Sequence, residues 1–245
     1  MIDLVSVLPV MALAFVGSII GGMTGYGTGL LMPLLLVPLV GPTPVVPIIS
    51  LGAIANNASR AYIFRDQIDL RRALLGGALA LPGAALTAWG YTLLTGRAVQ
   101  VIIGLMLLAM VIARRVLHRL DRHISQGTFC GLMALFGAVT GGTSGAGVML
   151  VSILLAAGLT GKAVIATDAL ISVALTLMKV GVFTAGGLIG KTELLLGAAI
   201  AAVAVPGAVI ARWTIERLPV RVHTALLDGV VILGAVFLLW QAFRG

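Results

Sequence analysis

The chain has 245 residues and a formal net charge of +8; 60% of its residues are hydrophobic and only 10% are charged. Soluble domains carry roughly 25% charged residues, so this composition excludes an ordinary soluble enzyme or binding domain. Several apolar stretches reach the roughly 20 residues that cross a bilayer as a helix, and none shows the alternating polarity of a barrel strand. We therefore predict an all-α polytopic membrane protein.

Eight apolar segments follow one another along the chain. They cover residues 4–40, 43–64, 73–94, 98–117, 127–158, 163–185, 192–212 and 220–243. The longest hydrophilic connection divides them into two groups of four. We therefore expect two membrane repeats, at 1–117 and 127–245, joined by a cytoplasmic loop at 118–126.

The first segment of each group contains the glycine pattern G-x3-G-G-x2-G-x-G, which reads GSIIGGMTGYG from Gly17 and GAVTGGTSGAG from Gly137. Further matches follow in the same order. Arg60 corresponds to Lys179, and ALPGAALTAW of the first half corresponds to AVPGAVIARW of the second. Matches that keep one order argue for an internal duplication.

The glycine pattern has two explanations, and the sequence leaves both open. Gly17, Gly21 and Gly25 form an every-fourth-residue stripe, by which membrane helices pack closely. Yet six glycines fall between Gly17 and Gly29. They remove about 6 kcal/mol of helix propensity relative to alanine, which favours a break in the helix. Unwound backbone inside a membrane lines a shielded or wet cavity, and its N–H groups bind anions.

We therefore expect the two glycine segments to line one substrate site, using backbone N–H groups and hydroxyls, with Thr28 as a further hydroxyl donor of the first segment. The candidates are Gly22, Thr24, Gly25, Tyr26 and Gly27 in the first copy and Gly142, Thr143, Ser144 and Gly145 in the second.

The loop charges also favour a broken first element in each half. If all eight segments cross the membrane, ten Lys and Arg residues lie on one side and five on the other. If each glycine-rich segment enters and returns on the same side, the division becomes twelve against three, namely Arg97, Lys191 and Arg244. The second arrangement follows the positive-inside rule more closely and makes the halves inverted repeats. The positive net charge therefore reflects membrane topology rather than nucleic-acid binding.

Polar side chains inside the apolar segments are candidate substrate ligands. A charge as deep as Lys179 costs about 2.5–3.5 kcal/mol and indicates a function, although Lys179 and Arg60 could instead snorkel to an interface. Asn56 and Asn57 lie within one turn of Arg60 and offer amide donors, unless they bond between helices. Asp168 is about 16 Å from Lys179 along one helix. It is too far for direct pairing, so we expect it to couple a proton or to start the helix.

The sequence shows no enzyme constellation. Ser144 has no neighbouring His, and the glycine runs lack the Lys of a P-loop. The single Cys130 and the three scattered His residues give no metal site. We expect no catalytic residue, no metal and no cofactor.

Two glycine-rich first segments, GSIIGGMTGYGTG and GAVTGGTSGAG, within a twofold four-segment duplication resemble the TauE/SafE (sulfite exporter, TSUP) family. The resemblance covers nearly the whole chain. It implies the transport of small sulfur-containing anions, such as sulfite and organosulfonates, across the cytoplasmic membrane.

We therefore expect a multi-pass secondary transporter of the inner (cytoplasmic) membrane that moves a small anion by alternating access, with Lys179 and Arg60 supplying positive charge. A passive anion channel and a non-transporting assembly subunit are the alternatives. Expected partners are the anionic substrate, a coupling proton or sodium ion, membrane lipid and a second copy of the chain in a homo-oligomer, but no nucleic acid.

Overall fold

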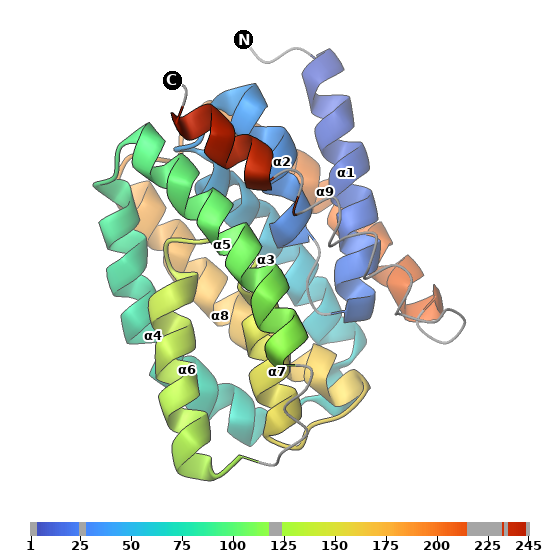
Figure 1. Cartoon of the computed structure of the whole chain (residues 1–245). Helices are drawn as coiled ribbons and strands as arrows, with labels where there is room; N and C mark the ends of the chain where they lie inside the picture. The colour runs from blue at the N-terminus through green and yellow to red at the C-terminus, as the bar shows by residue number, and fades with distance from the viewer. Residues whose placement is uncertain (1–3, 25–27, 118–123, 215–231, 233–234, 244–245) are drawn as a thin grey trace.

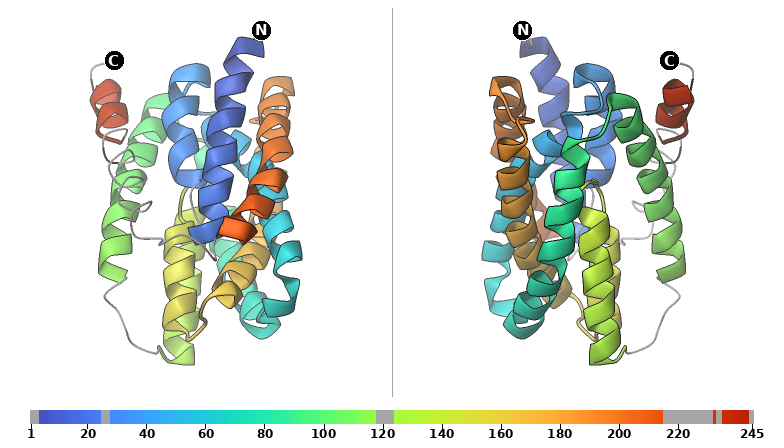
Figure 2. Two further views of the ribbon diagram at one scale, coloured as in Figure 1. Left: turned by 90° about the vertical axis from the view of Figure 1, so that its right-hand side faces the viewer. Right: turned by 90° about the vertical axis from the view of Figure 1, so that its left-hand side faces the viewer.

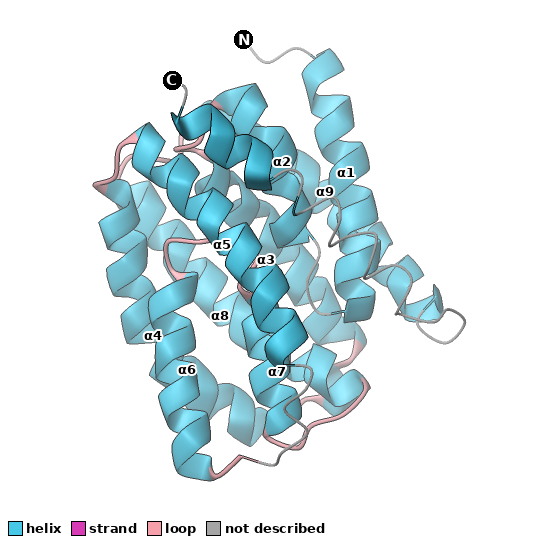
Figure 3. Ribbon diagram, in the orientation of Figure 1, coloured by secondary structure: helices cyan, strands magenta, loops and turns pink. Residues whose placement is uncertain are grey.

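The computed structural model describes residues 4–24, 28–117, 124–214, 232 and 235–243, and every regular element within them is helical (Figure 3). The all-α prediction is therefore confirmed. The elements are α1 (Leu4–Thr24), α2 (Thr28–Val40), α3 (Val45–Ile63), the 3-10 turn η1 (Arg65–Gln67), α4 (Leu70–Thr92), α5 (Gly96–Leu117), α6 (Gln126–Thr140), α7 (Gly147–Ala156), α8 (Lys162–Ala185) and α9 (Lys191–Thr214). Residues 235–243 are also helical.

Three helices in the described part of the chain are long and apolar enough to cross a membrane: Leu70–Thr92, Lys162–Ala185 and Lys191–Ala211. They are α4, α8 and most of α9. The helices of the two glycine-rich segments include shorter pieces, such as α2 with 13 residues and α7 with 10. At a rise of about 1.5 Å per residue, pieces of this length reach only part of the way across a bilayer.

Each glycine-rich segment contains two helices instead of one. In the second half, residues 141–146 between α6 and α7 are not helical. The N–H of Ile124, just before α6, donates to the carbonyl of Ala156 at the end of α7 at 3.0 Å. The chain therefore enters α6 and leaves α7 at the same end of the bundle (Figure 1). In the first half, α1 lies against the start of α2, where a Cβ on Gly17 would be 3.1 Å from the Cα of Thr28.

The two halves of the chain pack reciprocally. Helix α1 lies along α9, and α6 lies along α4, while α3 and α8 contact each other (Figures 1 and 2). A Cβ on Gly83 of α4 would lie 2.8 Å from the nitrogen of Ala138, and a Cβ on Gly207 of α9 would lie 2.7 Å from the Cβ of Ser18. Ala138 and Ser18 each follow the first glycine of the repeated pattern. Corresponding residues of the two glycine-rich segments thus make corresponding contacts with α4 and α9.

The glycines of α6 allow its close approach to α4. A methyl group at Gly137 or Gly141 would overlap the carbonyl oxygen of Ala80 or Ala84, respectively. Gly145 has a different role, because it lies in the non-helical stretch with φ +87°, a conformation that side chains disfavour. Close packing and a helix break, the two explanations of the pattern, therefore apply to different glycines of the same segment.

Apolar side chains form two large clusters, one mainly from α1, α2, α3 and α5 and the other mainly from α4, α6, α7 and α8. A separate group of buried polar side chains comes from α3, α8 and residues 143–144. It consists of Ser50, Asn56, Arg60, Thr143, Ser144, Thr167, Asp168, Thr176 and Lys179. Buried polar groups are costly unless they are paired, so this cluster is the candidate functional site.

The close packing of α6 predicts that alanine substitution has opposite effects on stability at two glycines of this helix. Gly137→Ala would force α6 away from α4, and overpacking of this kind costs typically 1–3 kcal/mol. Gly131→Ala is the matched control, because nothing lies within 4 Å of its missing Cβ, and alanine favours a helix by about 1 kcal/mol over glycine. We expect the unfolding temperature of the purified protein in detergent to fall for Gly137→Ala but not for Gly131→Ala. Equal effects would contradict the packing role of Gly137.

Candidate functional site

A cavity of about 120 Å³ lies where the two glycine-rich segments meet α3 and α8. It is lined by seven of the candidate residues: Asn56, Asn57, Arg60, Thr143, Ser144, Gly145 and Lys179. The expected hydroxyl donor Thr28 lines it too. Hydroxyl groups that the sequence analysis did not single out also line it, from Ser50, Thr140, Ser172 and Thr176. Tertiary structure thus gathers side chains that lie more than 100 residues apart in the chain.

The two glycine-rich segments touch directly at this cavity. The Ser144 hydroxyl donates to the carbonyl of Gly29 at 2.7 Å. A Cβ on Gly29 would lie 2.8 Å from the nitrogen of Gly145, so only glycine permits this approach. The contact makes one wall of the cavity from both copies of the repeated pattern.

Two helix N-termini face the same cavity. Thr28 and Gly29 are the first residues of α2, and Ala146 and Gly147 stand at the start of α7; all four line the cavity. A helix N-terminus carries a partial positive charge and N–H groups without helical partners. Two such ends that meet at one cavity favour an anionic occupant.

Lys179 of α8 brings a full positive charge to the cavity. Its side chain is buried, and its Nζ donates to the carbonyls of Thr140 at 3.0 Å and Thr143 at 2.9 Å. These carbonyls stand at and just beyond the end of α6, where the helix dipole is negative. The ammonium therefore does not snorkel to an interface. It has three N–H donors, and two are used in this way, which leaves one for a ligand.

Arg60 of α3 forms a buried ion pair with Asp168 of α8. Its Nη2 lies 2.7 Å from Oδ2 of Asp168, and the two side chains are 3% and 1% exposed. Arg60 also donates to Oδ1 of Asn57 at 3.3 Å. Burial of Arg60 argues against snorkelling here too. Asp168 neutralises Arg60 rather than lining the cavity, so among the described residues the uncompensated charge of the cavity wall is that of Lys179.

The amide of Asn56 is poorly satisfied among the described residues. Its Nδ2 lies 3.5 Å from the hydroxyl of Thr28, which is a long contact, and its Oδ1 is buried without a hydrogen-bond partner there. A buried polar atom without a partner costs about 1–3 kcal/mol. Such a group at a cavity wall suits a site that a polar ligand or water completes.

Several candidates lie elsewhere or outside the described part of the structure. Gly142 does not line the cavity, because it packs on α4, where a Cβ would be 3.0 Å from the carbonyl of Thr87. The side chains of the first-copy residues are not described, although two of these residues belong to α1. The candidates concerned are Gly22 and Thr24 in α1 and Gly25, Tyr26 and Gly27 beyond its end.

A signal in the sequence could have found some of the missed residues. Ser172, Thr176 and Lys179 are spaced by four and three residues, which places them on one face of a helix. Thr140 carried no such signal, because its position depends on where the second glycine-rich segment breaks.

The buried ion pair predicts a non-additive effect on stability. Removing one partner of a buried pair costs about 3–5 kcal/mol, because the other charge is left uncompensated. We therefore expect Arg60→Leu and Asp168→Leu each to lower the unfolding temperature in detergent, and the double variant to recover much of the loss. Arg65→Leu is the control, since Arg65 and Asp66 are exposed and 3.9 Å apart. A double variant whose loss equals the sum of the two singles would disprove the coupling.

Comparison with known proteins identifies the family. The family model described as "Sulfite exporter TauE/SafE" matches residues 10–238. Neither the curated proteins nor the solved structures contain a match to the chain. The matched region contains both glycine-rich segments, the cavity between them and the Arg60–Asp168 pair. The chain therefore belongs to the sulfite exporter TauE/SafE family of multi-pass membrane proteins.

Proposed function

We propose that this protein is a secondary transporter that carries a small organic or sulfur-containing anion, such as sulfite or an organosulfonate, across the cytoplasmic membrane by alternating access. Membership in a family of sulfite exporters gives the general activity. The observation that carries the finer proposal is the cavity at the buried Lys179 side chain, where an ammonium without a carboxylate partner among the described residues faces two helix N-termini.

The size and the lining of the cavity suit a small oxyanion. A volume of about 120 Å³ is enough for several water molecules, and therefore for an anion as small as sulfite. The lining supplies hydroxyls, amides and one ammonium, and these are the donors that oxyanion oxygens accept. A bound anion would compensate the charge of Lys179, which burial otherwise makes costly.

Reciprocal packing supports alternating access. We take the two halves as inverted repeats, because this arrangement gives the stronger positive-inside bias and agrees with the return of the chain from α6 to α7 at one end. A site where the two halves touch can open to either side when one half rocks against the other. In this mechanism the Ser144–Gly29 contact would break or shift during each cycle.

The charge of Lys179 gives the first transport prediction. Lys179→Met removes an ammonium that donates to the anion, and hydrogen bonds to charged groups contribute about 1.5–3 kcal/mol. We therefore expect the half-saturating sulfite concentration for counterflow in proteoliposomes to rise at least tenfold. Lys191→Met is the matched control, because Lys191 is exposed at the start of α9. Unchanged counterflow in Lys179→Met would show that this charge does not bind substrate.

The carboxylate of Asp168 is our candidate for ion coupling. Protonation of Asp168 would weaken its ion pair with Arg60, which joins a helix of the first half to one of the second. A proton would thereby be linked to the contact between the halves.

This coupling predicts a specific defect for Asp168→Asn. With an imposed pH gradient, we expect the parent protein to accumulate sulfite in proteoliposomes, whereas Asp168→Asn should exchange sulfite without accumulating it. Asp66→Asn, which changes an exposed carboxylate, should behave as the parent. If Asp168→Asn accumulates sulfite as the parent does, Asp168 is not the residue that couples transport to protons.

The same assays separate the other two functions. Flux in the parent that follows the sulfite gradient and never exceeds it would identify a passive channel. Absence of flux from the purified chain, with flux restored by a second protein, would identify an assembly subunit.

A further inference from the structure

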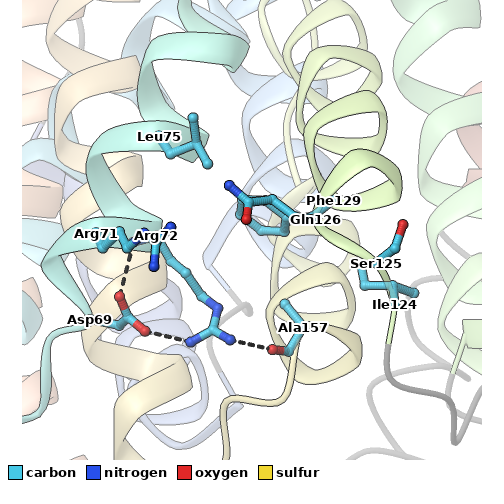
Figure 4. A pocket seen from close by; sticks show the side chains of 9 residues that line it. All are labelled: Asp69, Arg71, Arg72, Leu75, Ile124, Ser125, Gln126, Phe129 and Ala157. Carbon is cyan, nitrogen blue, oxygen red and sulfur yellow. Dashed lines mark hydrogen bonds and ion pairs between the residues drawn. The ribbon is translucent and has the colours of Figure 1, made fainter.

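A second cavity, of about 270 Å³, opens at one end of the bundle, away from Lys179. It lies between the start of α4, the start of α6 and the end of α7, so both halves of the chain contribute to it. Figure 4 shows the side chains that line it: Asp69, Arg71 and Arg72 from the first half face Ile124, Ser125, Gln126, Phe129 and Ala157 of the second, with Leu75 one turn further along α4.

The polar side of this cavity is held in a fixed arrangement. The carboxylate of Asp69 accepts from the N–H of Arg72 at 2.9 Å and from its guanidinium. The guanidinium also donates to the carbonyl of Ala157 at 2.7 Å. The backbone hydrogen bond from Arg72, with the guanidinium beside it, lowers the pKa of Asp69, so Asp69 is ionised at neutral pH. Among the described residues that line the cavity, two arginines and one carboxylate leave a net positive charge.

Donors remain available on this side. An arginine carries five N–H donors, and the two hydrogen bonds from the Arg72 guanidinium account for only part of them. Arg71 is exposed, lines the cavity and has no ion pair with the described carboxylates. The amide of Gln126 lies across the cavity from the arginines (Figure 4).

Polar and apolar groups of the cavity lie at different depths. Arg71, Arg72 and Gln126 belong to the first turns of α4 and α6, whereas Leu75 and Phe129 come three to four residues later. One helical turn advances about 5.4 Å. Because α4 is long and apolar enough to span a membrane, its first turn lies near the headgroups and its second turn lies deeper, beside acyl chains.

The charges at this end of the bundle match an anionic membrane surface. Arg65, Arg71, Arg72 and Lys162 lie here, whereas Arg97 and Lys191 lie at the other end of the described bundle. The positive-inside rule assigns the more basic end to the cytoplasm. The cytoplasmic leaflet carries anionic lipids, and basic pockets between membrane helices on that side bind their headgroups.

We propose that this cavity binds an anionic phospholipid, with the lipid phosphate at Arg71 and Arg72 and the upper part of an acyl chain against Leu75 and Phe129. Leu70 and Leu74 support the lipid, because they leave the outer face of α4 apolar, with 58% and 64% of their surfaces exposed. An acyl chain would continue along that face. The site is separate from the proposed transport site and does not depend on its function.

Native mass spectrometry of the purified full chain tests this proposal. With phosphatidylglycerol and phosphatidylcholine present at equal concentration, we expect preferential retention of phosphatidylglycerol. Loss of one basic residue at a membrane surface weakens anionic-lipid binding about fivefold, so Arg71→Gln should retain about fivefold less. Arg97→Gln is the matched control, since Arg97 is also exposed in the first turn of a helix, at the opposite end. Equal retention of both lipids, or equal effects of the two variants, would overturn the proposal.

Two further measurements identify the ligand and separate a loss of binding from a loss of folding. Arg71→Lys keeps the charge and should retain more phosphatidylglycerol than Arg71→Gln; equal loss in both would contradict a charge-based site. Soluble glycerol 3-phosphate offers the same phosphate without acyl chains. Thermal stabilisation by phosphatidylglycerol but not by glycerol 3-phosphate would support a lipid, whereas equal stabilisation would assign the cavity to a water-soluble phosphate and overturn the lipid proposal.

Discussion

A helix that ends inside a membrane protein leaves carbonyl groups that water cannot reach. These carbonyls need hydrogen-bond donors from the protein, and Lys179 supplies them. The last carbonyls of α6 and the backbone just beyond it receive hydrogen bonds from the Lys179 ammonium. The positive charge therefore has a structural reason to be buried there. The same charge stands beside the N-termini of α2 and α7, which are electrically positive as well. The hydrogen bonds of Lys179 thus stabilise the break between α6 and α7, and its charge gives the cavity a positive potential.

Close packing of glycine makes this geometry possible. Gly137 and Gly141 bring α6 against the backbone of α4, and Gly29 meets Gly145 across the cavity. Side chains at these places would push the two halves apart, because the added Cβ atoms would lie 2.8 Å or less from atoms of the other half. Because each half packs its Pro-Gly helix on the glycine-rich helix of the other, the contact surfaces of the two halves are matched. Matched surfaces of this kind agree with the predicted duplication.

The two halves match in their helix packing but differ in the groups that their buried cations contact. Arg60 and Lys179 are equivalent in the duplication, yet Arg60 is paired with a carboxylate and Lys179 with carbonyl groups. The sequence explains the difference in part: Asp168 stands eleven residues before Lys179, whereas Ile49 stands eleven residues before Arg60. The second half therefore supplies a carboxylate that neutralises the cation of the first half. Among the described residues a single net charge remains at the cavity, which suits a small anion better than two unpaired cations would.

The sequence by itself determined the helical class, predicted a duplication, indicated the family by resemblance and named seven candidate residues that line the cavity, besides the hydroxyl donor Thr28. These follow from composition, from glycine spacing and from the cost of a charge in an apolar segment, which are properties of the chain alone. It also gave two explanations for the glycines, between which local propensity could not decide. Only the tertiary structure assigned Gly137 and Gly141 to packing and Gly145 to the break, because contact with α4 and α2 depends on residues more than 50 positions away. The partners of Arg60 and Lys179 were likewise beyond the sequence, since hydrogen bonds between helices depend on their register, which no single segment encodes.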